Sequence, residues 1–302
     1  MRATLVRWTG GLALVAGVVL AAPAPARAAP AAAIQLAGTG TATGGAVGQQ
    51  AAAAPRAMWL WSRADPAAVI HFAVARGVAE IYAAVPWNVG ASGDLPRLQD
   101  LKQRADAAGI RLSALGGDPE WAVNHWAART WQRSAMETGL FAATHVDVEP
   151  YVLDRWNTDR AGTVSAFLGM LDAMRANDPR PLEADVPFWY GGIAAGGRTL
   201  ADEVLDRVDA VTVMSYRDTA TGPNSMADVA ADMLVRGTAS GTPVRLGAET
   251  HPLPDCPYCT FAEEGQAAML STLAAVDAAV SGYQAYAGIA VHHYDSWRVL
   301  GP

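Results

Sequence analysis

Residues 144–151 read THVDVEPY, the segment that most constrains the fold. Its alternation predicts a β-strand in which Asp147 and Glu149 point to one face and the valines beside them point to the other. Pro150 lacks a backbone N–H donor and ends the strand. Two acids therefore meet at the carboxyl end of a strand whose other face is apolar. Because acids at such a position are costly unless they line a wet mouth, the pattern indicates a catalytic site.

Seven further apolar, β-branched or aromatic runs share the character of this strand. They lie at 57–61, 80–85, 111–117, 182–189, 210–216, 244–250 and 288–294. Helical segments separate them, the clearest having Asp65 as N-cap, Pro66 at the first helical position and Gly77 as its stop. Eight strand–helix alternations predict a closed parallel sheet, so the expected fold is α/β, a single-domain (β/α)8 TIM barrel. Only eight residues follow the last strand, and the last helix is therefore expected to be truncated or absent.

The amino-terminal part of the chain has a different composition. Residues 1–28 place two arginines before an apolar run that is too short to span a bilayer, and they end in a small-residue cleavage pattern, Ala-Arg-Ala. This order predicts a signal peptide and a secreted, extracellular protein. Residues 29–56 are rich in Ala and Gly and nearly uncharged, which predicts a flexible leader. The barrel is expected over residues 57–302.

The charge balance excludes some classes of partner. The chain has 22 basic and 29 acidic residues, a formal net charge of −7. Loss of residues 1–28 would remove three arginines and leave 19 basic residues against 29 acids, a net charge of −10. An acidic chain without a Lys/Arg cluster is a poor candidate for binding nucleic acid or anionic membranes. No membrane span is expected after the signal peptide, and the sequence does not indicate an oligomeric state.

The two cysteines of the chain, Cys256 and Cys259, form a CPYC motif in a proline-rich loop. The same tetrapeptide is found in glutaredoxins, where it opens a helix near the start of a small domain. In an oxidising compartment two nearby cysteines more often clip a loop, so a disulfide is the leading interpretation. A redox role, free thiols and metal binding are the alternatives.

Polar and aromatic residues gather where the predicted strands end, and barrel enzymes place their active sites at these ends. The candidate catalytic residues are Glu149, Asp147, Asp185, Tyr216 and Glu249. The candidate substrate-binding residues are Trp61, Trp87, Asp118, Trp121, Tyr151, Trp189, Met214, Arg217, Asp218, His293 and Trp297. Carboxylates among aromatic rings suit a sugar site, because the rings stack on pyranose C–H faces while the acids transfer protons. The expected substrate is a carbohydrate, and no organic cofactor is predicted.

Histidines near the same strand ends raise the question of a metal. His251 could meet the pair His292 and His293, but neighbouring strand residues face opposite ways, so at most one of the pair points inward. The sequence contains no H-x-x-x-H or H-x-H ligand pair. Structural or hydrogen-bonding histidines are therefore favoured, and no metal site is predicted.

Three motifs together support a family resemblance. HVDVEP at 145–150, VMSYRD at 213–218 and the late Trp297 resemble motifs of the chitinase-like family 18 glycoside hydrolases, which carry D-x-x-D-x-D-x-E on strand four, M-x-Y on strand six and a Trp on strand eight. The order is kept along the whole predicted barrel, although the motifs cover a small part of it. The chain also resembles a group of secreted glycosidase-like barrel proteins with GGDPxW, HxDVEPY, PFW, YRD and ETH-like segments, a resemblance that implies no activity.

The family 18 resemblance implies roles for individual residues. Glu149 would be the general acid and Asp147 the aspartate that orients a substrate acetamide. The remaining matched positions, Met214, Tyr216 and Trp297, would line the sugar subsite. The two earlier aspartates of the signature fall on Ala142 and His145, a departure that bears on proton transfer behind Asp147 and on whether the substrate is an N-acetyl sugar.

Two other interpretations fit the same residues. Glu149 and Glu249 occupy the strand positions of acid/base and nucleophile in the large retaining glycosidase clan, although Val148 stands where those enzymes carry Asn. Carboxyl groups about 5 Å apart would indicate a retaining mechanism, and a gap of roughly 6.5–9.5 Å would admit a water. The other interpretation is a lectin-like carbohydrate-binding barrel, which the missing aspartates favour and the retained Glu149 disfavours. Whether the enzyme is of the family 18 type or of the retaining clan, like-charge repulsion by Asp147 is expected to raise the pKa of Glu149.

Overall fold

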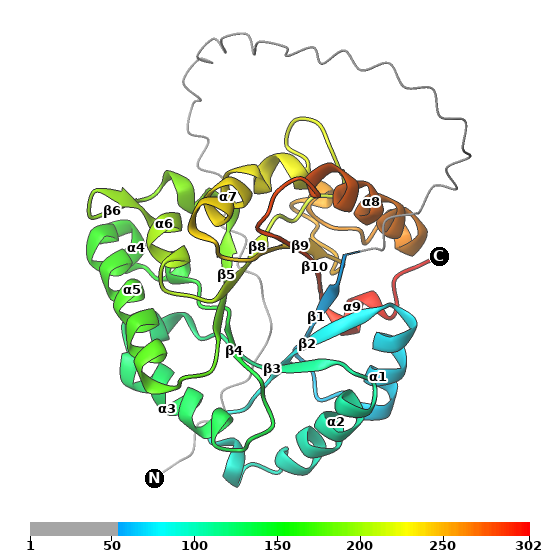
Figure 1. Ribbon diagram of the computed structural model, residues 1–302, viewed down its shortest axis with the longest axis horizontal. Helices are drawn as coiled ribbons and strands as arrows, with labels where there is room; N and C mark the ends of the chain where they lie inside the picture. The colour runs from blue at the N-terminus through cyan, green and yellow to red at the C-terminus, as the bar shows by residue number, and fades with distance from the viewer. Residues whose placement is uncertain (1–53) are drawn as a thin grey trace, which may run out of the picture. The chain divides into compact units, whose positions relative to one another are not determined.

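A computed structural model describes residues 54–302, which form a closed barrel of eight parallel strands surrounded by helices (Figure 1). The strands follow the order β1-β10-β9-β8-β5-β4-β3-β2 around the barrel. Their bounds are β1 Arg56–Leu60, β2 Val78–Ala84, β3 Arg111–Gly116, β4 Thr144–Val146, β5 Leu182–Pro187, β8 Ala210–Met214, β9 Val244–Glu249 and β10 Tyr286–His292. Two short strands, β6 Ala194–Ala195 and β7 Arg198–Thr199, pair separately. The predicted (β/α)8 fold is confirmed.

Helices alternate with the strands around the barrel (Figure 1). The α-helices are α1 Pro66–Ala75, α2 Leu95–Ala107, α3 His125–Met136, α4 Arg155–Thr158, α5 Arg160–Asn177, α6 Leu200–Leu205, α7 Met226–Ser240, α8 Gly265–Val280 and α9 Tyr294–Trp297. Short 3-10 helices occupy several loops: η1 Val89–Ala91, η2 Pro119–Ala122, η3 Pro150–Val152, η4 Phe188–Gly192 and η5 Pro257–Cys259. The last helix is a single turn, as expected from the short chain after β10. None of the helices within residues 54–302 is long and apolar enough to cross a membrane.

Local sequence explains where α1 begins and ends. The Asp65 side chain accepts a hydrogen bond from the Ala68 backbone N–H at 2.9 Å, and Pro66 occupies the first helical position. After the helix, Gly77 has φ +65°, a left-handed conformation that other residues rarely adopt. The capped, proline-started and glycine-stopped helix predicted from the sequence is therefore confirmed.

The amino-terminal edge of the barrel lies slightly before the predicted boundary at residue 57. Arg56 starts β1 and donates to both carboxylate oxygens of Asp277 on α8, at 3.0 and 2.6 Å. Pro55 lies so close to Gly288 of β10 that a Cβ there would be 2.1 Å from the Pro55 carbonyl oxygen. Residues 54–56 therefore belong to the barrel. The predicted signal peptide and the rest of the predicted leader lie outside the described residues.

Strand β4 is shorter than the predicted strand over 144–151, because only residues 144–146 pair in the sheet. The chain stays against β3 for one more step, since the Asp147 N–H donates to the Gly116 carbonyl at 2.9 Å. Close approach continues at Gly117, where a Cβ would lie 2.1 Å from the Asp147 carbonyl oxygen. The chain then turns into η3 at Pro150. The two acids consequently lie in the loop after β4, where they face the mouth of the barrel.

Two separate apolar clusters pack the two faces of the strands. The larger cluster joins the helices to residues such as Met58 and Leu60 of β1. A small cluster forms from alternate positions, including Trp59, Tyr82 and Leu115, which identifies it as the barrel interior. Buried polar side chains occupy much of the remaining interior: Glu80, Ser113, His145, Glu183, Asp185, Thr212 and Glu249. The interior is therefore charged to an extent that the apolar strand pattern did not predict.

The predicted disulfide between Cys256 and Cys259 is present in the loop after β9. Tyr258, between the two cysteines, accepts a hydrogen bond at its carbonyl from the Asp218 N–H at 3.1 Å. The clipped loop is thereby held against the segment that follows β8.

Candidate active site

Two acids lie just beyond the carboxyl end of β4. Asp147 is partly buried, and its Oδ1 atom is shielded from solvent and meets no hydrogen-bond partner among residues 54–302. Burial raises the pKa of Asp147 well above its usual range, and the negative charges of Asp185 and Glu149 raise it further. Asp147 therefore holds a proton much more tightly than an exposed aspartate does.

Glu149, the second acid, is also partly buried. The hydroxyl of Tyr151 donates a hydrogen bond to its Oε1 atom. Burial raises the pKa of Glu149, the Tyr151 hydrogen bond opposes the rise, and the charge of Asp185 adds to it. Burial, and not the repulsion by Asp147 expected from the sequence, is thus the largest cause. A raised pKa favours the protonated form of the carboxyl group, which is the form that a general acid needs.

Asp185 stands beside Asp147 on the neighbouring strand. In the β4–β5 register His145 pairs with Glu183 and Val146 with Ala184, so the next step brings Asp147 level with Asp185. The Asp185 side chain is only 1% exposed. Its Oδ1 lies 2.9 Å from His145 Nε2, and its Oδ2 accepts a hydrogen bond from Trp59 Nε1 at 2.9 Å. Both oxygens of Asp185 are engaged inside the barrel, and its charge acts on Asp147 and Glu149. Its predicted catalytic role stays a prediction.

Glu249 ends β9 on the far side of the mouth and is fully buried. Its Oε1 accepts backbone hydrogen bonds from Thr250 and His251, both at 2.7 Å, and its Oε2 lies 2.7 Å from His292 Nδ1. Burial acts to raise the pKa of Glu249, but His292 and the two backbone donors lower it below its usual value. These bonds hold the carboxylate in place and disfavour the nucleophilic role considered for it.

His292 also connects Glu249 to a predicted sugar-binding residue. Trp61 Nε1 donates a hydrogen bond to His292 Nε2 at 3.0 Å. Because Nε2 accepts this bond, the ring proton lies on Nδ1, where it is donated to Glu249. The series Trp61–His292–Glu249 therefore orients the Trp61 indole at the mouth.

Tyr216 follows β8 and lies close enough to the acids for their charges to act on its hydroxyl. Its ring lies against Gly247, where a Cβ would be 2.9 Å from Tyr216 Cε1, so β9 needs a glycine at this point. Burial raises the pKa of its hydroxyl, and so do, in decreasing order, the charges of Glu249, Asp185, Asp147 and Glu149. The predicted catalytic residues thus lie within electrostatic range of one hydroxyl group. Met214, the last residue of β8, precedes Tyr216 by two residues and is partly buried.

Aromatic side chains stand beside Glu149 on one side of the site. The Trp189 indole is 36% exposed, and its ring centroid lies 5.2 Å from that of Tyr151 and 6.1 Å from that of Trp156. The Tyr190 hydroxyl is buried without a hydrogen-bond partner in the described part of the chain. Burial and the charges of Glu149 and Asp147 raise its pKa. Trp156 and Tyr190 are therefore additional candidates that the sequence analysis missed.

A second aromatic pair is exposed at another part of the same barrel end. Trp87 follows β2 and is 48% exposed, and Trp126 near the start of α3 is 64% exposed. Their ring centroids lie 6.2 Å apart. Trp87 is thus accessible, as a substrate-binding residue needs to be, but no contact links it to Glu149.

Three predicted substrate-binding residues have structural positions instead. Trp297 is 1% exposed and packs edge-on against Phe72 of α1, because α9 directs its ring into the core between strands and helices. Trp121 is 5% exposed and packs against Trp131, with ring centroids 4.9 Å apart. The Asp118 side chain accepts a hydrogen bond from the Glu120 N–H at 3.0 Å and caps η2. These three side chains thus make packing or capping contacts, and their predicted contact with substrate stays a prediction.

Three other predicted residues lie in the loops around the mouth. Arg217 packs over the Phe188 and Tyr258 rings, at 5.2 and 5.5 Å from their centroids, next to the partly buried Asp218. Burial raises the pKa of Asp218. His293 caps α9, and burial lowers its pKa to about 4, which keeps this ring neutral.

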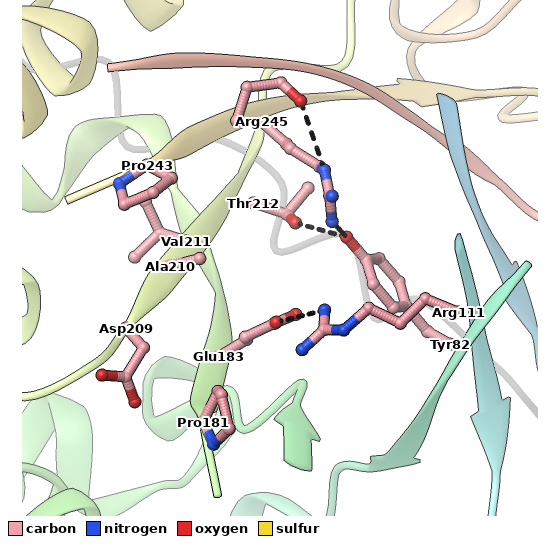
Figure 2. Close-up of a pocket in the computed structure, with 11 residues that line it drawn as sticks. Tyr82, Arg111, Pro181, Glu183, Asp209, Ala210, Val211, Thr212, Pro243 and Arg245 are labelled. Carbon is pink, nitrogen blue, oxygen red and sulfur yellow. Dashed lines mark hydrogen bonds and ion pairs between the residues drawn. The ribbon is translucent and has the colours of Figure 1, made fainter. Parts of the chain in front are cut away.

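A cavity of about 260 Å³ opens at the opposite, amino-terminal end of the strands (Figure 2). Arg111, Glu183 and Arg245 line it, and Arg111 Nη1 donates to Glu183 Oε1 at 2.7 Å. Barrel enzymes act at the carboxyl ends of their strands, so this cavity is not the candidate active site. No group of three or more His, Cys, Asp or Glu side chains placed to hold a metal ion occurs within residues 54–302.

Comparisons with known proteins show which solved structures share the fold of this chain. The sequence matches no protein-family model, and no curated protein matches it. Among solved structures, the spore cortex-lytic enzyme SleL of Bacillus cereus is similar with a TM-score of 0.54 and 9% identity, over 82% of this chain and 73% of that one. A GH18 chitinase from Pseudoalteromonas aurantia is similar with a TM-score of 0.55 and 13% identity, over 80% of this chain and 94% of that one. The chain therefore has a chitinase-like TIM-barrel fold.

Proposed function

We propose that the protein is a secreted glycoside hydrolase that cleaves an oligo- or polysaccharide with Glu149 as general acid. The observation that carries this proposal is the environment of Glu149, a partly buried carboxyl with a raised pKa at the carboxyl end of a barrel. Fold likeness alone would not identify a reaction. A carboxyl group with a raised pKa, hydrogen-bonded to Tyr151 and so close to the Trp189 ring beside it, supplies the chemistry that glycoside cleavage needs.

In the proposed reaction, Glu149 donates its proton to the glycosidic oxygen as the bond from that oxygen to the anomeric carbon breaks. Positive charge develops on the sugar ring, and nearby carboxylates stabilise it. Asp147, with its unpartnered Oδ1, is placed to hydrogen-bond a polar substituent of the substrate such as an acetamide. Water completes the hydrolysis and returns a proton to Glu149.

Similar structures, the aromatic group at the site and the charge of the chain support a carbohydrate substrate. The solved structures of similar fold are named as chitinases and as a spore cortex-lytic enzyme. The aromatic group at Trp189 suits stacking on pyranose rings. The acidic composition agrees with an uncharged substrate and gives no reason to expect nucleic acid.

Secretion is proposed from the amino-terminal sequence, where residues 1–28 have the order of a signal peptide. The disulfide between Cys256 and Cys259 supports the same location, because disulfides persist in oxidising compartments. Fractionation of a host that expresses the full chain tests this point: intact mass of the extracellular protein should show cleavage near Ala28.

A non-catalytic carbohydrate-binding barrel is the second candidate. The observation that favours it is His145, which occupies a position where the motif of catalytic family 18 enzymes has an aspartate. The two candidates differ in whether the protein breaks a bond or only retains the glycan.

The deciding experiment compares wild type, Glu149→Gln and the control Glu264→Gln on a panel of microbial and plant polysaccharides. Glu264 is exposed at the start of α8 and lies outside the site. Mass spectrometry of soluble products should show oligosaccharides from wild type and the control but not from Glu149→Gln. Equal product from all three would exclude Glu149 as the acid. Retention of the protein on one polymer without any product would favour the binding barrel.

A further inference from the structure

A continuous series of charged side chains runs through the barrel, from the amino-terminal cavity to the acids at the mouth. At the cavity, Arg111 Nη1 donates to Glu183 Oε1 at 2.7 Å (Figure 2). Arg245 Nη1 donates to Glu80 Oε2 at 2.6 Å, and Arg111 also donates to Glu80. Glu183 then contacts His145, the next residue of the series. The charges alternate along this path, which allows buried ions to be compensated without solvent.

His145 links the lower part of this series to the active site. Its Nδ1 lies 3.2 Å from Glu183 Oε2, and its Nε2 lies 2.9 Å from Asp185 Oδ1. A neutral imidazole has one N–H donor and one lone pair, so it can donate to only one of two carboxylates. Two carboxylates, one at each nitrogen, are satisfied only by the doubly protonated ring. The geometry alone therefore indicates an imidazolium cation.

The remaining surroundings of the ring agree with a fixed charge. The His145 side chain is 1% exposed, and its ring stacks on Tyr82 with centroids 3.6 Å apart and planes 16° apart. Burial acts to lower the pKa of His145, but Asp185 and Glu183 outweigh burial and raise it to about 10. The same contacts lower the pKa of Glu183 to about 2, with Arg111 contributing.

Asp185 accepts the hydrogen bond from His145 Nε2, and its negative charge acts on Asp147 and Glu149. Because its two oxygens accept from His145 and Trp59, the group has the hydrogen-bonding pattern of an ionised carboxylate. It follows Ala184, which pairs with Val146 in the β4–β5 register, and its charge acts on Asp147, the residue after Val146. Its negative charge raises the pKa of Asp147 and of Glu149, and the charge of His145 lowers the pKa of Asp147 by a smaller amount.

We propose that His145 is a permanent cation that holds the Asp185 carboxylate in place, and that Asp185 supplies the fixed negative charge that strengthens proton binding by Asp147 and Glu149. The inference rests on the proposed role of Glu149. His145 and Asp185 are positioning residues, since neither is placed to touch the substrate. The carboxylate that acts on Asp147 thus comes from β5. The family 18 motif has an aspartate at position 145 of β4, and in this chain the position carries the histidine that holds the β5 carboxylate.

Other ionisable groups also face the acid pair and have to be considered. Tyr151 from η3, Tyr190 from η4, Tyr216 after β8, Glu249 from β9 and His292 from β10 lie around it. Of these, Tyr151 stabilises the ionised form of Glu149 through its hydrogen bond. The charge of Asp185 raises the pKa of both Asp147 and Glu149, so Asp185 is the group to change.

The first test is nitrogen NMR of the wild-type protein. Protein with ¹⁵N-labelled histidine is titrated from pH 6 to 9, and the His145 signals are assigned as those missing in His145→Gln. Both ring nitrogens should keep imidazolium shifts across the range, whereas exposed histidines lose theirs near pH 6.5. A neutral ring at pH 7.5 would overturn the proposal. This measurement needs no substrate and no active variant.

The second test removes the fixed charge with Asp185→Asn. Loss of a negative charge lowers the proton affinity of Glu149, so the alkaline limb of kcat/KM should move to lower pH by about one unit, roughly a tenfold loss of rate above that limb. Asp277→Asn is the control, because that carboxylate pairs with Arg56 on the outside of the barrel. The control should leave the limb in place.

A direct titration separates failure of this inference from failure of the proposed function. The ¹³Cδ signal of Glu149, assigned from Glu149→Gln, reports its protonation whether or not any polymer is cleaved. Its midpoint should fall in Asp185→Asn, which must retain the circular dichroism of the wild type. An unchanged midpoint in folded Asp185→Asn would overturn the role of Asp185. An inactive protein that shows the expected shift would contradict hydrolysis only.

Discussion

Trp59 donates its indole N–H to Asp185 Oδ2 at 2.9 Å, a bond that joins β1 to β5 across the interior of the barrel. The two residues are 126 positions apart in sequence. Trp59 is 1% exposed, so the bond is formed away from solvent. It fixes the carboxylate on which the acid pair depends and leaves His145 facing the other oxygen.

Replacing Trp59 by Phe should destabilise the protein mainly through this bond. A hydrogen bond to a charged group contributes about 1.5–3 kcal/mol, more than a bond between neutral groups. Trp131→Phe is a matched control, since Trp131 Nε1 donates to the neutral Val85 carbonyl at 2.9 Å and the indole is equally buried. Urea unfolding should show a larger loss for Trp59→Phe. Equal losses would contradict a charged Asp185.

Replacing Tyr151 by Phe should move the pH profile in the opposite direction to Asp185→Asn. The Tyr151 hydroxyl stabilises the ionised form of Glu149, so its loss raises the pKa of Glu149 further. A general acid must be protonated, and the alkaline limb of kcat/KM should therefore move to higher pH. Tyr283→Phe, on the loop after α8, serves as control and should leave the profile unchanged. A limb that moves to lower pH would contradict the arrangement.

Replacing Trp189 by Ala should weaken substrate binding with little effect on the fold. The indole is 36% exposed beside Tyr151, where it can stack on a sugar ring. We expect KM to rise about tenfold, which corresponds to about 1.4 kcal/mol of lost binding. Initial rates over a range of substrate concentrations measure this change. A normal KM would place the sugar elsewhere at the mouth.

Trp297 offers the contrasting case. Its ring is buried against Phe72, and removal of a buried Trp side chain typically costs about 3–5 kcal/mol. Trp297→Ala should therefore lower the free energy of unfolding strongly while KM of the folded fraction stays normal. Denaturant titration and steady-state kinetics on the same preparation test both parts. A selective rise in KM would restore Trp297 to the substrate site.

The buried histidine also predicts how stability depends on pH. The pKa of His145 is raised in the folded protein, from 6.5 to about 10, so its contribution to stability is complete below pH 6.5 and is lost as pH rises through about 10. The free energy of unfolding should fall by at least ~2 kcal/mol between pH 7 and 10.5. His145→Gln should be less stable at pH 7 and show a smaller fall. Parallel curves for the two proteins would show that another group causes the loss.

Much of the architecture could be predicted because it depends on local patterns. The alternation of apolar strands with capped helices predicted eight strands and a short final helix, and the acids at 147 and 149 marked the mouth of the barrel. The CPYC spacing indicated a disulfide between residues that lie next to each other in any loop. Each of these features needs only neighbouring residues and the periodicity of strand or helix.

Roles that depend on distant neighbours were harder to predict. The oxygens of Glu249, the candidate nucleophile, are bound to His292 and to backbone N–H groups, contacts that the strand pattern does not reveal. His145 was noted only as a departure from a motif, although it lies two residues before Asp147 and so shares its face of the strand. That spacing was the signal that could have identified it.

The sequence by itself determined the order of the elements, the barrel and the position of the acids, because backbone periodicity, caps and turn residues act over a few positions. Only the tertiary structure decided which charges meet inside it. Glu183 and Asp185 reach His145 from a strand that is about forty residues away, with distances of 3.2 and 2.9 Å. The pKa of a buried group depends on such through-space neighbours and on lost hydration, and neither follows from the order of residues along the chain.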